Sequence, residues 1–150
     1  MVTDDAPARV SPTLDADVSF LLARASAITA AAGNRALAVV GLKVRSYSVL
    51  ALAAEVGPSQ RELAERLRLD PSQIVALVDA LESGGYVERR QDPADRRART
   101  VTATPAGVEL FARARAAVDD AQRESFAAIS DGESDVVRAF LRRIAYSDLS

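Results

Sequence analysis

The residue types of the chain limit the chemistry that it can perform. Its 150 residues include no Cys, no His and no Trp. They therefore cannot form a cysteine nucleophile, a His-based triad, a Cys/His zinc site or a thiol redox switch. No glycine-rich phosphate-binding loop is present, and the acids read as solvated or capping residues, although a catalytic carboxylate pair stays open. We expect no enzyme, no metal and no cofactor.

A cluster of arginines is the clearest sign of anion recognition. Five Arg and two Asp lie within residues 89–99, on a chain whose 19 basic and 21 acidic residues leave a net charge of −2. Arginines at a rigid turn can enter the minor groove of DNA, where the negative potential is enhanced. The expected DNA contacts are Arg96, Arg97 and Arg99, with Asp95 holding the Arg97 guanidinium in a fork. The alternative is a solvated, charged turn.

A second group of candidates lies at the start of a helix predicted over Asp70–Ser83. Its inward stripe is formed by Ile74, Leu77, Val78 and Leu81, at helical spacing. The residues left outward or on the flanks include Ser72, Gln73, Val75 and Ala76. Here Ser72 could bind a phosphate or base, Gln73 could pair with adenine, and an apolar side chain could touch a thymine methyl. Alternatively, Ser72 and Gln73 only cap the helix.

Capping signals and periodicity predict the elements that position these residues. A capping box at Ser59–Glu62 opens a short helix, and Asp70-Pro71 opens the next after a tight turn, which makes a helix-turn-helix. After Gly84-Gly85, the β-favouring runs 86–90 and 99–103 predict a hairpin with a long polar tip. We therefore expect a mainly α protein with a small β-hairpin wing, and a winged helix-turn-helix over residues 44–104.

Flanking helices are predicted on both sides of this unit. Residues 1–13 read as a flexible arm, residues 14–40 as a helix that can pause at Gly33-Asn34, and residues 105–129 and 131–146 as two further helices. Their apolar stripes need a partner, and a second copy of the chain is the simplest one. We expect dimerisation regions at 14–43 and 105–150, around a DNA-binding domain at 44–104.

Several segments resemble the MarR family of transcriptional regulators, over roughly residues 14–146. They are Arg61–Leu67, Leu77–Arg89, Asp92–Arg97 and Thr104–Gly107, and the Asp-x-Arg pair of Asp95 and Arg97 is the most family-specific piece. The resemblance implies a homodimer joined by its N- and C-terminal helices. It also implies binding to a palindromic DNA operator, usually as a repressor, and often release by a small aromatic or phenolic ligand.

The resemblance also implies a small-molecule site between the dimer helices and the DNA-binding lobe. Arg beside aromatic side chains would suit a carboxylate on an apolar ring. The implied wall residues are Phe20, Arg24, Arg45, Tyr47, Phe111 and Arg115. The alternative is that the aromatic rings belong to the core and the arginines pair with neighbours.

The sequence also departs from the family pattern. Val75 and Ala76 stand where the family often has Thr and a basic residue or Gly, so operator preference does not transfer. Sensing through Cys oxidation, or through the His and Cys ligands of zinc-sensing members, is excluded by composition.

The remaining expectations concern location and an alternative function. The acidic N-terminus and the lack of an apolar run near 18 residues predict a cytoplasmic protein without a membrane partner. The alternative is a helical adaptor that uses the winged helix for protein contacts instead of DNA. Steep weakening of DNA binding by salt would distinguish a regulator from such an adaptor.

Overall fold

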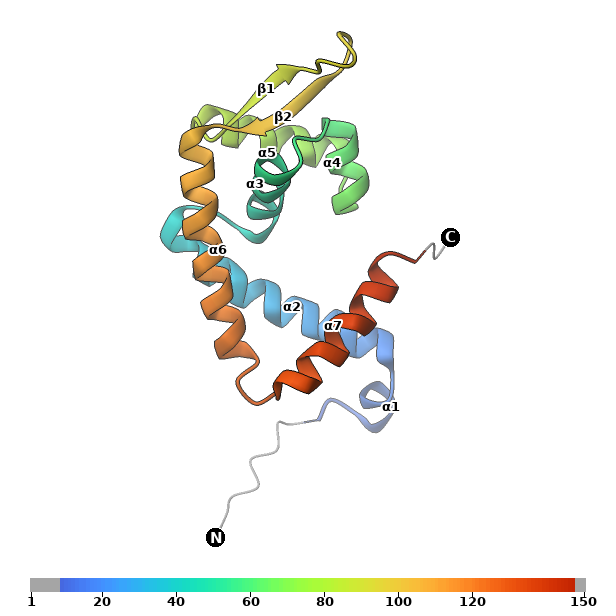
Figure 1. Ribbon diagram of the computed structural model, residues 1–150. Coiled ribbons are helices and arrows are strands. Elements are labelled where there is room, and N and C mark those ends of the chain that lie inside the picture. Colours follow the sequence, from blue (N-terminus) through green and yellow to red (C-terminus); the bar gives the residue numbers. More distant parts are fainter. Residues whose placement is uncertain (1–8, 148–150) are drawn as a thin grey trace.

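The structure is a computed structural model that describes residues 9–147. Its elements, in chain order, are α1 (Pro12–Asp15), α2 (Val18–Leu37), the 3₁₀ turn η1 (Ala38–Val40), α3 (Val44–Glu55), α4 (Gln60–Leu67), α5 (Pro71–Ser83), β1 (Val87–Gln91), β2 (Arg99–Ala103), α6 (Pro105–Ser125) and α7 (Asp131–Ala145). Helices α3, α4 and α5 and the hairpin lie together at one end (Figure 1). Helix α6 runs away from them and packs against α2, and α7 turns back from the far end of α6 (Figure 1). The predicted mainly α fold with a hairpin wing is confirmed.

Local capping bonds fix the helix-turn-helix. The Ser59 hydroxyl accepts from the Glu62 amide, and Glu62 Oε2 accepts from the Ser59 amide at 2.8 Å, so the predicted capping box is confirmed. Helix α4 ends at Leu67, and its C-cap residue Arg68, with a left-handed φ of 50°, turns the chain toward α5. Asp70 occupies the N-cap of α5, but its side chain makes no capping hydrogen bond, in contrast to our expectation. The fixed φ of Pro71 at the first helical position favours the start of α5 instead.

The hairpin is antiparallel and docks on the start of α4. Its register pairs Val87 with Ala103 at the base and Gln91 with Arg99 toward the tip. The amide of Val101 donates to the Pro58 carbonyl at 2.8 Å, and Ser59 forms an isolated bridge with Thr100. The backbone before α4 therefore acts as a third, very short strand beside β2.

One hydrophobic core lies beneath the hairpin. Its largest fully buried side chains come from α2, α3, α4, α5 and α6, and they are Leu37, Leu50, Leu63, Ile74 and Leu110. Val87 and Val101 extend the core into the two strands. This packing holds the helix-turn-helix, the hairpin and the first half of α6 together as one body.

The N-terminal region differs from the prediction in two places. Pro12 and Thr13 belong to α1, so this end of the predicted 1–13 arm is helical, while residues 1–8 lie outside the described part. The predicted helix from residue 14 is also broken before α2. The Asp17 carboxylate accepts from the Phe20 amide at 3.0 Å and caps α2 as a new helix.

The predicted pause at Gly33-Asn34 is wrong, because α2 continues to Leu37. These two residues instead receive the start of α3. Asn34 Oδ1 accepts from the Val44 amide at 2.8 Å, and a Cβ at Gly33 would lie 2.9 Å from a Val44 methyl. The absence of a side chain at Gly33 therefore allows α3 to approach α2 closely.

The C-terminal helices leave much apolar surface uncovered. Helix α6 ends at Ser125, before the predicted end at residue 129, and the capping box of Ser130 with Glu133 then opens α7 as predicted. Within residues 9–147, α7 does not pack extensively against another element. Its exposed apolar side chains are Val136, Val137, Phe140 and Leu141. A helix with such a face requires a partner surface to bury it.

We also compared the helices with the dimensions of a membrane span. No single helix in the described part of the chain is long and apolar enough to cross a membrane. One helix pair, Val18–Val40 with Val44–Glu55, has the required length and composition but is bent by 68°.

Candidate nucleic-acid interface

Helix α5 has one buried face and one open face. Ile74, Val78 and Leu81 point into the core. The four candidate contact residues on the other faces are all exposed, and they are Ser72, Gln73, Val75 and Ala76. Among the described residues, the side chains of Ser72 and Gln73 make no hydrogen bond that would cap the helix, so the capping alternative has no support. Their polar groups remain available to a ligand outside the chain.

The tip of the hairpin is ordered by its own side chains. Asp92 Oδ1 accepts from the Ala94 amide at 2.9 Å, and the Gln91 side-chain amide donates to the Arg96 carbonyl at 2.6 Å. Asp95 Oδ1 accepts from the Arg97 amide, also at 2.9 Å. Each Asp accepts from an amide two residues ahead, which is the pattern of an Asx turn. These bonds fix the path of the arginine-bearing loop.

The prediction that the Asp95 carboxylate binds the Arg97 guanidinium in a forked ion pair is wrong. The Asp95 carboxylate binds the backbone amide of Arg97 instead, because a separation of two residues favours the local turn. Arg96, Arg97 and Arg99 are exposed, and within residues 9–147 none of them forms an ion pair. Three exposed guanidinium groups therefore lie at this end of the hairpin, two on the ordered loop and one on the first residue of β2.

An ion-pair cluster that sequence reasoning missed joins the hairpin to α5. The Arg89 guanidinium, on β1, binds Asp79 and Glu82 of α5, and its Nε donates to Gln60 Oε1 of α4 at 2.6 Å. The Arg89 amide also donates to Glu82 Oε1 at 3.1 Å. Burial opposes the charge of Arg89, but the hydrogen bond to Asp79 and the charge of Glu82 outweigh it and raise its pKa. The sequence signal for this cluster was the spacing of Asp79 and Glu82, which lie three residues apart and therefore on one face of the helix.

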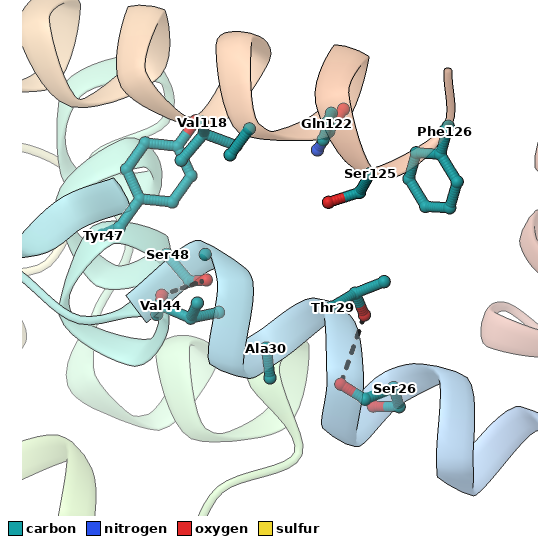
Figure 2. A pocket seen from close by; sticks show the side chains of 12 residues that line it. Ser26, Thr29, Ala30, Val44, Tyr47, Ser48, Val118, Gln122, Ser125 and Phe126 are labelled. Carbon is teal, nitrogen blue, oxygen red and sulfur yellow. Dashed lines mark hydrogen bonds between the residues drawn. The ribbon is translucent and has the colours of Figure 1, made fainter. Parts of the chain in front are cut away.

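A cavity of about 380 Å³ lies between α2, α3 and α6. In Figure 2, side chains of α6 face those of α2 across the space, and the Tyr47 ring closes one end. The wall is mostly apolar with a few hydroxyl groups, and it is formed by Ser26, Thr29, Ala30, Gly33, Val44, Tyr47, Ser48, Val118, Ala121, Gln122, Ser125 and Phe126. Such a lining suits a small apolar or aromatic group.

The structure places the six predicted ligand residues in different environments. Tyr47 lines the cavity, and Phe111 packs behind it with the two ring centroids 5.9 Å apart. Burial raises the pKa of the Tyr47 hydroxyl, Asp119 adds to this effect, and Arg115 opposes it. A neutral Tyr47 hydroxyl can donate a hydrogen bond to a ligand.

The other predicted wall residues do not line this cavity in a single chain. Phe20 is half-buried on α2, and Arg24 and Arg45 are exposed on α2 and α3. The wall residues that the prediction missed come from α2, from the start of α3 and from the last turns of α6, which packs against α2. Sequence periodicity assigned Val118 and Phe126 only to an apolar stripe.

A second cavity, of about 660 Å³, adjoins the first and shares Tyr47 and Ser48 with it. It lies between α3, α4 and the end of α7. Its wall includes Arg66 and Arg68 beside one acid, Glu65. Among the described residues, neither arginine forms an ion pair. The apolar cavity therefore borders a region that carries cations.

Comparisons with known proteins agree with this architecture. A sequence profile described as MarR family matches residues 40–98. The crystal structure of a MarR-family transcriptional regulator from Rhodococcus sp. RHA1 is 44% identical, with a TM-score of 0.84, over 91% of this chain and 97% of that one. A putative transcriptional regulatory protein for the hcr operon of Thauera aromatica is 35% identical over 97 residues, which are 65% of this chain. The matched region spans 58% of the Thauera protein.

Two similar structures contain ligands. CouR from Rhodococcus jostii RHA1, solved bound to p-coumaroyl-CoA, is 44% identical with a TM-score of 0.83, over 93% of this chain and 99% of that one. A transcriptional repressor CouR, solved bound to a 23-mer DNA duplex, is 28% identical with a TM-score of 0.82, over 92% of this chain and 99% of that one. The profile match, the high identity over nearly the whole chain and the winged helix-turn-helix together show that the chain belongs to the MarR family of transcriptional regulators.

Proposed function

We propose that the chain is a homodimeric repressor that binds a palindromic DNA operator and is released from it by a small molecule. The observation that carries the proposal is the open face of α5 beside an ordered hairpin, whose loop and first β2 residue carry three exposed arginines that form no ion pair among the described residues. The similar CouR structure bound to a DNA duplex supports this use of the fold. A regulator of this kind would work in the cytoplasm and perform no catalysis.

Each protomer would read DNA with two elements. Helix α5 would enter the major groove, with Ser72 and Gln73 at base edges or phosphates and Val75 or Ala76 at a thymine methyl. The hairpin would lie along the flanking minor groove, where the arginine tip meets enhanced negative potential. A twofold dimer would place its two α5 helices about 34 Å apart, one turn of DNA.

Dimerisation would use the outer helices. Val18, Leu21 and Ile28 of α2 are exposed in a single chain, as is the apolar face of α7. A second copy would bury these faces in an isologous interface. In this arrangement regions 14–43 and 105–150 join the two copies, and residues 44–104 form the DNA-binding unit.

The effector would enter the cavity between α2, α3 and α6. The CouR relative holds p-coumaroyl-CoA, an aromatic acyl group on an anionic carrier. Here an aromatic acyl group would lie beside Tyr47, and the carrier phosphates would lie near Arg66 and Arg68 in the adjoining cavity. Among the predicted residues, Phe111 packs against Tyr47, the charge of the exposed Arg115 acts on the Tyr47 hydroxyl, and Phe20, Arg24 and Arg45 would complete the site in the dimer.

Fluorescence anisotropy on the DNA upstream of the gene tests DNA binding. We expect footprinting on the same DNA to show protection of a short inverted repeat, and anisotropy to give a stoichiometry of one dimer per site and an affinity that falls steeply with salt. A protein that is monomeric in solution, or that does not bind duplex DNA at low salt, would overturn the proposal. An adaptor would show no competition from duplex DNA.

The effector is tested on the same complex. We expect p-coumaroyl-CoA to release the DNA, and p-coumarate alone and coenzyme A alone to release much less. Equal affinity for DNA with and without the thioester would refute this ligand class while leaving the DNA-binding proposal intact.

A further inference from the structure

The proposed reading helix has an unusual charge. Helix α5 contains no Lys and no Arg, and its acidic residues are Asp79 and Glu82. Their side chains are 57% and 41% exposed. An uncompensated carboxylate on a helix in the major groove would be repelled by the phosphates on both sides of the groove. The fold must therefore neutralise these two groups if α5 is to read DNA.

A single side chain from the hairpin neutralises both. The Arg89 guanidinium binds Asp79 and Glu82 through its two terminal nitrogens, while its Nε is held by Gln60. The Arg89 side chain is only 17% exposed, in contrast to the other arginines of the 89–99 run. In this forked geometry the charge of Arg89 is paired with carboxylates of the protein, so its guanidinium does not contact a phosphate.

The same contacts join three elements. Arg89 lies on β1, its two acids lie on α5, and Gln60 is the first residue of α4. The neighbouring Arg90 behaves differently, because it pairs with Glu88 of its own strand and its side chain is 66% exposed. Of these two neighbouring arginines on β1, Arg89 therefore connects the strand to α5 and α4, whereas Arg90 does not.

We infer that Arg89 is a positioning residue for DNA binding, which screens the two α5 carboxylates from the phosphates and holds the wing beside α5. The inference rests on the proposed function. It assigns Arg89 a role distinct from that of Arg96, Arg97 and Arg99, which would contact the DNA directly. The carboxylates of α5 become repulsive groups when Arg89 loses its charge.

The test compares charge variants by anisotropy on one operator duplex. Arg89→Gln keeps a polar side chain but removes the charge, and we expect its affinity to fall about tenfold or more at low salt. Arg89→Lys keeps the charge and should bind within about threefold of the wild type. Adding Asp79→Asn and Glu82→Gln to Arg89→Gln should recover most of the loss.

A control separates local screening from net charge. Asp120 and Glu124 are exposed on α6, away from the hairpin, and neutralising them in the Arg89→Gln background gives the same net charge as the rescue variant. We expect no recovery in this control. Equal recovery in both triple variants, or no recovery in either, would overturn the inference.

Two further outcomes are distinguished. A wild type that does not bind DNA contradicts the proposed function, whereas a wild type that binds no better than Arg89→Gln contradicts only the role of Arg89. If circular dichroism shows that Arg89→Gln is unfolded, the double variant Asp79→Asn, Glu82→Gln, which keeps Arg89, tests the inference instead. Removing both acids frees the cation, so the salt dependence should steepen by up to about 0.9 log units per protomer, and an unchanged slope refutes the inference.

Discussion

Replacing Gly107 with Ala should weaken the joint between the wing and α6. A Cβ at this position would lie 1.9 Å from the Tyr86 carbonyl oxygen, whereas ordinary contacts begin at 3.4 Å, so the backbones must separate by 1.5 Å. The Tyr86 oxygen also accepts from the Thr104 amide at 3.0 Å, and the Thr104 hydroxyl caps α6 by accepting from the Gly107 amide. The separation therefore strains the contact and disturbs the cap.

The expected cost follows from these two effects. Overpacking at a rigid contact costs about 1–3 kcal/mol, and loss of a helix N-cap costs about 1 kcal/mol. We therefore expect a loss of about 3 kcal/mol in the free energy of unfolding, which corresponds to a fall of roughly 6–12 °C in Tm for a chain of this size. This is a large part of the stability of a typical domain.

Thermal unfolding at matched protein concentration measures the effect, because the Tm of a dimer depends on concentration. The control is Gly132→Ala in α7, where an added Cβ meets nothing within 4 Å. Alanine favours helix over glycine, so this control should be neutral or up to about 1 kcal/mol more stable. A change of less than about 0.5 kcal/mol in Gly107→Ala would refute the inferred close contact.

Three further predictions concern DNA contacts and pH. Arg97→Ala should weaken operator binding more than the control Arg113→Ala on α6. It should also reduce the slope of the logarithm of the binding constant against the logarithm of salt concentration by about 0.9 per lost phosphate contact. Equal losses of affinity in the two variants, measured by anisotropy, would contradict the assignment of Arg97 to a DNA-binding wing. Gln73→Ala should relax preference at one base position in each half-site by about 1–3 kcal/mol, and unchanged selectivity on a panel of operator variants would show that it does not read a base. The Ser59 amide lowers the pKa of Glu62 below its ordinary 4.5, so the capping stabilisation is present above that value and is lost as pH falls through the folded pKa. Thermal unfolding from about pH 5 to about pH 3 should show a smaller decrease in Tm for Glu62→Gln than for the wild type, and parallel curves would contradict this role.

Signals within a few residues of each other predicted the reading unit well. The hydroxyl of Ser59 and the carboxylate of Glu62 are close enough in sequence to define a helix start, and the stripe from Ile74 to Leu81 defines the buried face of α5. The strand 99–103 was also predicted at its observed bounds. Each of these features depends on contacts inside one element or one turn, which the sequence specifies directly.

Features that depend on the assembly of several elements were not predicted. Arg89 was counted in the arginine cluster at residues 89–99 but was given no role of its own, and the docking of the hairpin brings it to Asp79 and Glu82. The apolar stripe predicted on the helix over residues 105–129 was assigned to a second copy of the chain, and two of its residues, Val118 and Phe126, also line the cavity where α6 packs against α2. Periodicity identifies an apolar face but carries no information about which partner covers it.

The close contact between Gly33 and Val44 gives the cavity mechanical importance. Both residues belong to its wall, and the neighbouring Asn34 side chain holds the first turn of α3. In the proposed regulator, a molecule that fills this space would contact the junction between the outer helix α2 and α3, the helix that supports the reading unit. Occupancy of this space would thereby act on the spacing of the two DNA-binding units through one tightly packed corner, where an added Cβ at Gly33 would lie 2.9 Å from a Val44 methyl group.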